Sequence, residues 1–168
     1  MELDFNKIIR LKKIRIEKSE LSEEENTLAS PILRDKSLIR DIYKIFVELL
    51  NSRSLPPCID SVTQRKKFIF IILYLFSPSS LAGGKMASGL RPEIAKVLGV
   101  QSECTISDNC ADVVFLYQNY GDFSGDIEYL YTEIGWRKVN CVMRCFSFKL
   151  IGRGSASAKG VHQHSRRA

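Results

Sequence analysis

The chain has 168 residues, 45% of them hydrophobic, which is enough to bury the core of a single domain. Its net charge of +6 is unevenly placed, because residues 137–168 carry eight basic residues and no acidic one, whereas residues 1–136 carry 17 basic and 19 acidic residues. The longest apolar run, residues 68–76, is much shorter than the roughly 20 residues that cross a bilayer, so a membrane-spanning protein is excluded.

The first residues and the cysteines bear on the compartment of the protein. The N-terminus has no apolar stretch followed by a small-residue cleavage site, which argues against secretion. The five cysteines are odd in number and irregularly spaced, as is typical of reduced thiols. We therefore expect a cytoplasmic protein.

The two ends of the chain differ in composition from the middle. Residues 1–16 interleave apolar and basic side chains with a spacing that fits neither secondary-structure period, so a basic helix and an extended arm both remain open. Residues 17–26, EKSELSEEEN, indicate a solvated linker or helix end. The expected organisation is an N-terminal arm and acidic linker over 1–30, a helical domain over 31–138, and a basic, disordered tail over 139–168.

Two helices are predicted in the first half of the domain. Residues 38–50 carry apolar side chains at intervals of three and four, and Ser37 is suited to cap this helix. The segment NSRSLPP then ends it. Asp60 or Ser61 is expected to cap a second helix, exposed over residues 64–67 and buried over residues 68–76. For that apolar run a central strand is the alternative.

The second half begins with a small-residue loop over residues 77–88. Pro92 suits the first turn of a short helix that Gly99 ends. Thr105 can cap a longer helix that runs until Gly121.

A last helix, capped by Ser124 or Asp126, would bury one apolar face. The predicted fold class is therefore all-α: a small helical bundle with a helix-turn-helix-like centre and flexible termini. The residues expected on that buried face are Ile127, Leu130, Tyr131 and Ile134.

The centre of the chain resembles a known family. The segment TQR at 63–65, the apolar helix after it, GLRPEIAKVLGV at 89–100 and then Thr105-Ile106 resemble the DNA-binding domain of LuxR/FixJ-type regulators and the similar promoter-binding region 4 of sigma factors. Ala95 is small where two helices would cross, and Gly99 permits a left-handed turn. Ile94, Leu98 and Val100 are the expected core residues.

The resemblance, which covers about residues 61–120, implies a small DNA-binding or transcription-regulating protein of the kind found on phages and mobile elements. It assigns base contacts to Ser107 and Asn109. Cations near it in the sequence would hold backbone phosphates of double-stranded DNA, although they are equally well explained as solubilising charges. These cations are Arg65, Lys66, Lys67, Lys85, Arg91 and Lys96.

Residues 101–136 favour a different function, because they contain seven acidic residues and no Lys or Arg. Such a surface repels phosphates. The alternative is a non-catalytic protein-interaction or virion-associated module in which this acidic, aromatic-rich segment binds a basic partner. Its aromatic residues are interpreted as core and rim aromatics or as a partner-binding surface: Tyr117, Tyr120, Tyr129, Tyr131 and Trp136.

Catalysis and metal binding have little support in the sequence. The only two histidines, His162 and His164, lie in the tail. With Cys141 and Cys145 they form a CxxxC…HxH arrangement, whose one-residue His spacing falls outside the usual zinc patterns. We therefore expect neither an enzyme, nor a bound metal, nor a cofactor.

Overall fold

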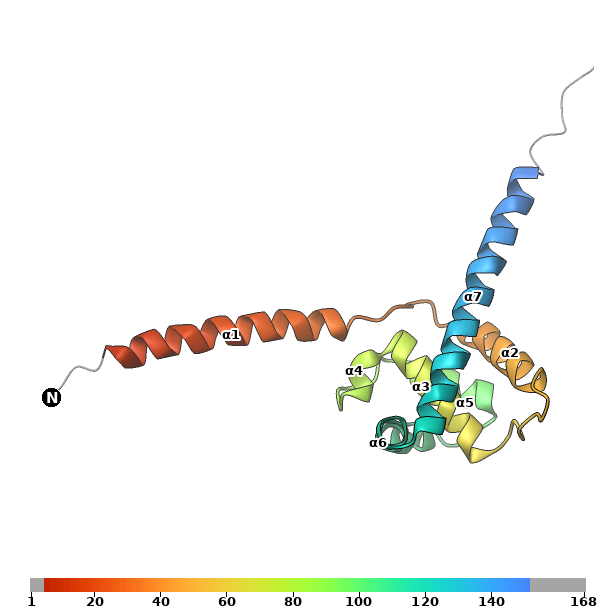
Figure 1. The fold of residues 1–168 in the computed structure, drawn as a ribbon, viewed down its shortest axis with the longest axis horizontal. Coiled ribbons are helices and arrows are strands. Elements are labelled where there is room, and N and C mark those ends of the chain that lie inside the picture. Colours follow the sequence, from red (N-terminus) through yellow and green to blue (C-terminus); the bar gives the residue numbers. More distant parts are fainter. Residues whose placement is uncertain (1–4, 152–168) are drawn as a thin grey trace, which may run out of the picture. The chain divides into compact units, whose positions relative to one another are not determined.

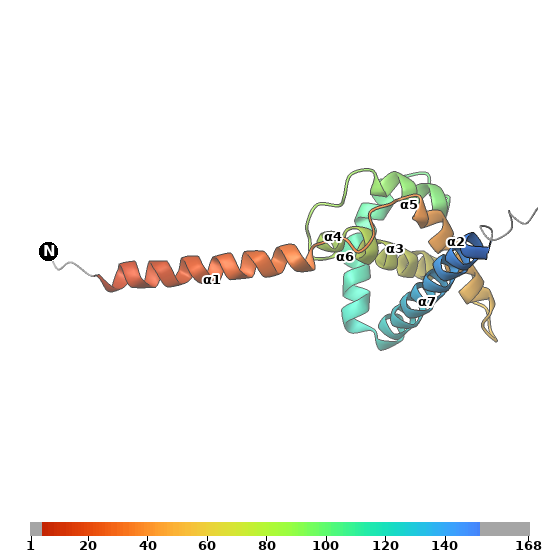
Figure 2. The same ribbon diagram turned by 90° about the horizontal axis from the view of Figure 1, so that it is seen from above.

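The computed structural model describes the backbone of residues 5–151 and the side chains of residues 5–137. Within that range the chain forms helices and no strand, so the all-α prediction is confirmed and residues 68–76 are helical (Figures 1 and 2). The helices are α1 (Asn6–Leu28), α2 (Leu38–Asn51), α3 (Val62–Phe76), α4 (Pro78–Leu81), α5 (Leu90–Leu98), α6 (Cys104–Asn119) and α7 (Gly121–Ile151).

The chain divides into two compact units, residues 1–134 and residues 135–168. The boundary falls within α7, which extends to Ile151 and so includes residues that we expected in the basic tail. The side chains of Cys141 and Cys145, and all of His162 and His164, lie outside the described residues.

The core of the first unit is built around α3. From Phe68 to Phe76 every residue except Tyr74 is buried, because this helix is apolar on all sides and neighbours cover each face. It contacts α2, α4, α5 and α6. Helix α2 is amphipathic and covers α3 with one apolar stripe. The ring centroid of Phe46, in this stripe, lies 5.3 Å from the ring centroid of Phe68 on α3. The buried residues of the stripe are Ile39, Ile42, Phe46, Leu49 and Leu50.

Helices α5 and α6 pack against each other and against α3, in the order expected of a helix-turn-helix. Gly99 ends α5 in the left-handed conformation, with φ +65°, and the Val100 N–H closes the turn on the Ala95 carbonyl at 2.9 Å. Ile94 and Ala95 are buried, as predicted, whereas Leu98 and Val100 are only half-buried.

Several predicted helix caps are wrong. The Ser61 side chain does accept from the Gln64 N–H at 3.3 Å, but Ser37 makes no such bond. Helix α6 begins before Thr105, and α7 begins at Gly121. Ser124 and Asp126 therefore lie inside α7, where Asp126 binds cations of other elements instead of the helix start.

Of the two interpretations of residues 17–26, a solvated linker and a helix end, the helix end is confirmed, because α1 continues through these residues to Leu28. Lys13 and Glu17, one turn apart, support the helix with an ion pair of 3.7 Å. The solvated character was correctly predicted, since α1 contains no buried residue.

Candidate functional site

Of the three cations on α3 that were expected to bind phosphate, Lys66 and Lys67 are paired within the protein. Lys66 Nζ lies 2.9 Å from an Asp112 carboxylate oxygen on α6. Lys67 Nζ lies 2.5 Å from an Asp126 oxygen on α7, and only 8% of its side chain is exposed. The expectation that residues 64–67 are exposed is wrong for Gln64 and Lys67, because both are buried.

The two predicted base-reading residues are turned toward the protein. The Ser107 hydroxyl oxygen is buried and has no hydrogen-bond partner among the described residues. The Asn109 amide donates to the Thr105 carbonyl one turn earlier, at 2.5 Å, so it is occupied by its own helix. In this conformation the Ser107 hydroxyl is not free to reach a base edge, and one N–H of the half-buried Asn109 amide is already bonded.

The remaining predicted cations separate into two groups. Lys85 and Arg91 are exposed and line one groove of about 530 Å³ along α6, together with Ser107. Lys96 is exposed elsewhere on α5, and Arg65 is half-buried with an unpartnered Nε. Arg91 also lies near Cys110, whose thiol pKa is raised by burial and partly lowered by the Arg91 charge.

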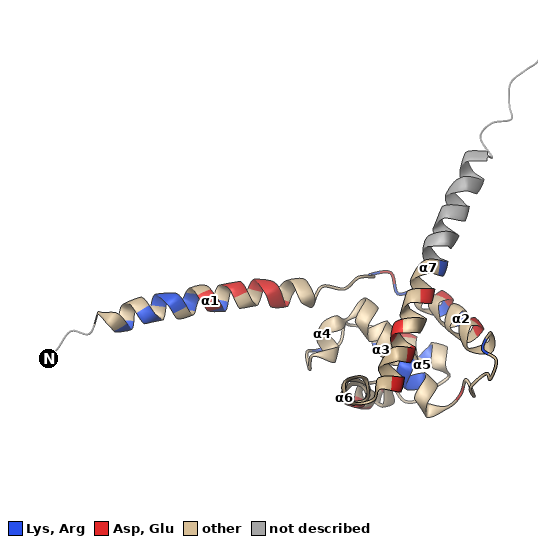
Figure 3. Cartoon of the chain, in the orientation of Figure 1, with Lys and Arg blue, Asp and Glu red and all other residues tan. Residues whose placement is uncertain are grey.

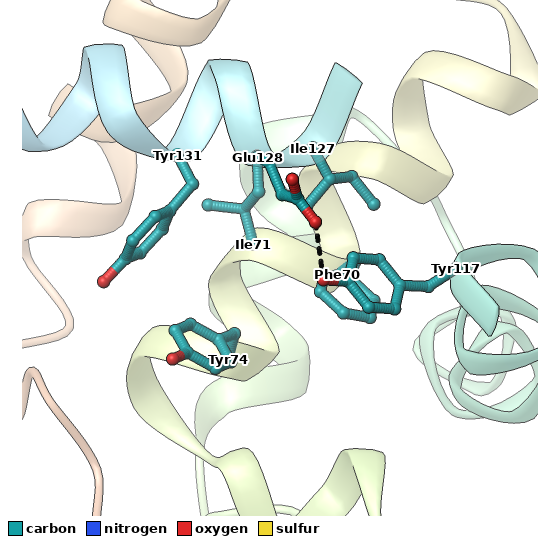
Figure 4. Close-up of a pocket in the computed structure, with 7 residues that line it drawn as sticks. All are labelled: Phe70, Ile71, Tyr74, Tyr117, Ile127, Glu128 and Tyr131. Atoms are coloured by element: carbon teal, nitrogen blue, oxygen red, sulfur yellow. Dashed lines mark hydrogen bonds between the residues drawn. The ribbon is translucent and has the colours of Figure 1, made fainter. Parts of the chain in front are cut away.

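A second cavity, which was not predicted, lies where α3, α6 and α7 meet and has a volume of about 230 Å³ (Figure 4). We refer to it as the aromatic pocket. Phe70 and Tyr74 are one turn apart on α3, and Ile127 and Tyr131 are one turn apart on α7, so each helix presents one face to it. The lining residues are Phe70, Ile71, Tyr74, Tyr117, Ile127, Glu128 and Tyr131.

Aromatic rings stand on two sides of the aromatic pocket. Phe70 and Tyr117 stack with their centroids 4.6 Å apart, and Tyr74 meets Tyr131 edge-on at 5.4 Å. Figure 4 shows these pairs on opposite sides, with Glu128 between them. Both pair geometries are favourable for aromatic rings, so the walls are held by packing as well as by the helices.

Glu128 supplies the charged side chain of the aromatic pocket. The Tyr117 hydroxyl donates to a Glu128 carboxylate oxygen at 3.1 Å, and Glu128 is exposed to solvent. Burial, followed by this hydrogen bond and the charge of Glu128, raises the pKa of Tyr117. Burial, followed by the nearby Tyr74, raises the pKa of Tyr131. Tyr117 and Tyr131 are therefore neutral phenols at physiological pH.

A cluster of ionic contacts fixes the first turns of α7, from which Glu128 projects. Asp126 accepts from Lys67 of α3 and, at 3.2 Å, from Arg53 of the α2–α3 connection. Burial alone would raise the pKa of Asp126, but the two hydrogen bonds and positive charges outweigh it and lower that pKa. The pocket wall is thus tied to α3 by a partly buried ion pair.

The aromatic pocket combines π faces with one carboxylate and an apolar floor. Ring faces carry negative electrostatic potential and attract ammonium and guanidinium groups. Such a lining suits a cationic side chain better than an anion. In the part of the chain with described side chains, no group of three or more His, Cys, Asp or Glu residues is placed to hold a metal ion.

Comparison with known proteins identified no relative: no family model, no curated protein and no solved structure matches the chain. Among the described helices, none has the length and the apolar content that a membrane crossing requires.

Proposed function

We propose that the protein is a non-catalytic interaction module that binds a basic segment of a partner protein and holds one Lys or Arg side chain of it in the aromatic pocket. The observation that supports this proposal is the lining, which has aromatic rings on two sides and the Glu128 carboxylate between them (Figure 4). A cation over such rings gains about 0.5–2 kcal/mol, and more as water is excluded.

The acidic residues of the segment 101–136 favour the same partner. Of the seven acidic residues between positions 101 and 136, Asp112 and Asp126 are paired with cations of the bundle. Four of the others, Glu103, Asp108, Asp122 and Glu128, are exposed. Exposed charges of one sign attract an oppositely charged partner over about 10 Å, and added salt weakens that attraction.

A binding measurement with a short labelled Gly-Lys peptide tests this function. We expect E128Q to weaken binding about three- to five-fold, as loss of a partly exposed ion pair does. Removal of the exposed ring with Y74L should weaken it by a similar factor. The matched controls are E103Q, which removes an exposed charge outside the pocket, and Y120L, which removes an exposed ring outside it.

The controls decide between a specific pocket and a diffuse acidic surface. If E103Q weakens binding as much as E128Q does, charge alone accounts for the affinity and the pocket has no role. Absence of peptide binding at low salt would contradict the proposed function itself. Amide chemical shifts of the full chain on peptide addition should change around Tyr74, Tyr117 and Tyr131.

DNA binding is the second candidate function, and the position of two exposed cations favours it. Lys85 and Arg91 are exposed and line the same groove along α6, the helix that would enter the major groove of DNA. We expect K85Q/R91Q to weaken binding of double-stranded DNA and to reduce the slope of log affinity against log salt by about 2. An unchanged slope in this variant, with R10Q/K12Q as the control in α1, would contradict the DNA-binding proposal.

A further inference from the structure

Helix α1 exposes apolar side chains along its whole length. It has 23 residues and none is buried. Ile14, Leu21 and Leu28 are 48%, 65% and 72% exposed. Helices in proteins gain most of their stability from packing of an apolar face, so a helix with these side chains in water lacks the contact that would stabilise it.

The spacing of these side chains is that of a coiled-coil seam. Ile14, Leu21 and Leu28 are seven residues apart and fall at d positions of a heptad. Leu11, three residues before Ile14, falls at an a position. An exact seven-residue repeat drifts by about 20° per heptad around a straight helix and is compensated by left-handed supercoiling with a second helix. The face is therefore suited to another helix of the same kind.

The charges of α1 are divided between its two halves. Residues 6–16 contain five basic residues and no acidic one, whereas residues 17–28 contain five glutamates and one lysine. Figure 3 shows the basic side chains toward the start of α1 and the acidic ones toward its end. Two parallel copies would place like charges side by side, but two antiparallel copies place each basic half beside an acidic half.

We propose that α1 pairs with α1 of a second copy of this chain as an antiparallel coiled coil. An antiparallel seam places a positions opposite d positions. Leu11 therefore meets Leu28 of the partner subunit, and the charged a positions Lys18 and Glu25 meet Leu21 of the partner subunit and Ile14 of the partner subunit. A polar residue at an a position lowers stability but specifies register and orientation. In this register residues 11–28 of the two helices overlap, so the contact would extend over about 27 Å. This pairing of α1 does not depend on the function of the aromatic pocket.

Sedimentation of the full chain over a range of concentrations tests the pairing. We expect the weight-average mass to rise toward twice the monomer mass at low salt and to fall back as salt is added. I14N/L21N, which changes the seam, should remain monomeric. I9N/I16N, which makes the same change on the opposite face, should still dimerise. A chain that is monomeric at every concentration, or a dimer that I14N/L21N leaves intact, overturns the proposal.

Charge exchange tests the orientation. In a variant that carries R10E/K12E/K13E/R15E together with E20K/E23K/E24K/E25K, the two halves have exchanged sign. An antiparallel coil predicts that this variant pairs with itself and does not mix with the unaltered chain, since each mixed pair would bring like charges together. Native mass spectrometry of a mixture reports which pairs form. Mixed dimers in excess over the like pairs would indicate parallel helices and overturn the proposal.

Discussion

At the scale of single residues, Asp126 connects three parts of the bundle, because it binds Lys67 and Arg53 together. We expect D126N to lower the free energy of unfolding by about 2–4 kcal/mol at pH 7, since it leaves the Lys67 charge buried beside a neutral amide. Urea unfolding followed by circular dichroism measures this change.

The matched control is D112N. The Asp112 carboxylate is 60% exposed and its partner Lys66 is 20% exposed, so we expect a loss below about 1 kcal/mol. Equal losses of unfolding free energy in the two variants would show that burial of the Lys67–Asp126 ion pair does not add to its contribution to stability.

The same carboxylate makes stability depend on pH. The pKa of Asp126 is lowered in the folded state, so its stabilisation is present above the unfolded value of about 3.9 and is lost as the pH falls through the folded-state pKa. We expect the unaltered chain to lose stability more steeply below about pH 4 than D126N does. Parallel curves for the two proteins, from unfolding at a series of pH values, would contradict this contribution.

Charged residues also show where sequence reasoning failed at this scale. Lys66 and Lys67 precede an apolar run, and such a position is usually solvated. Their partners, Asp112 and Asp126, lie 46 and 59 residues away, on helices whose placement no local pattern gives. A lysine can be buried when a distant carboxylate pairs with it, and the long side chain then packs along apolar neighbours.

At the scale of elements, Gly99 is the position where backbone conformation matters most for the α5–α6 turn. It has φ +65°, and a Cβ built there meets nothing within 4 Å. We expect G99A to destabilise the bundle by about 1 kcal/mol, because the left-handed conformation itself is unfavourable for alanine.

The control for Gly99 is Gly125. It lies inside α7, and a Cβ there also meets nothing within 4 Å. Because alanine favours a helix over glycine, G125A should stabilise by about 0.5–1 kcal/mol. Changes of the same sign in both variants, measured by urea unfolding, would contradict the assigned conformations.

The helices themselves were largely predictable, and their ends were not. Periodic apolar spacing located α2, and the pairing of Pro92 with Gly99 located α5. Ser37 was placed correctly before the first residue of α2, although its side chain makes no capping bond. The failure at Thr105 arose because a capping residue type marks several nearby positions, and packing decides which of them begins the helix. For the acidic segment over residues 17–26 a linker and a helix end both stayed open, because a charged and solvated composition occurs in loops and in exposed helices alike.

At the scale of the whole molecule, the aromatic pocket could be predicted only in part. Tyr117 and Tyr131 were recognised as core, rim or partner-binding aromatics. Their meeting with Phe70 and Tyr74 depends on how three helices cross. Phe70 and Tyr74 are four residues apart, as are Ile127 and Tyr131, and this spacing indicates that each pair lies on one face of its helix. It does not indicate that the two faces meet.

The junction of α6 and α7 has a consequence for the position of the Glu128 carboxylate in the aromatic pocket. Helix α6 ends at Asn119 and α7 begins at Gly121, so Tyr120 alone connects them. Tyr117 and Glu128, which bond across the pocket, are therefore separated by only eleven residues, nearly all helical. One residue inserted within α7 before Glu128 would turn that carboxylate by about 100° around the helix axis. The rotational phase of two consecutive helices thus determines whether the carboxylate stands between the rings.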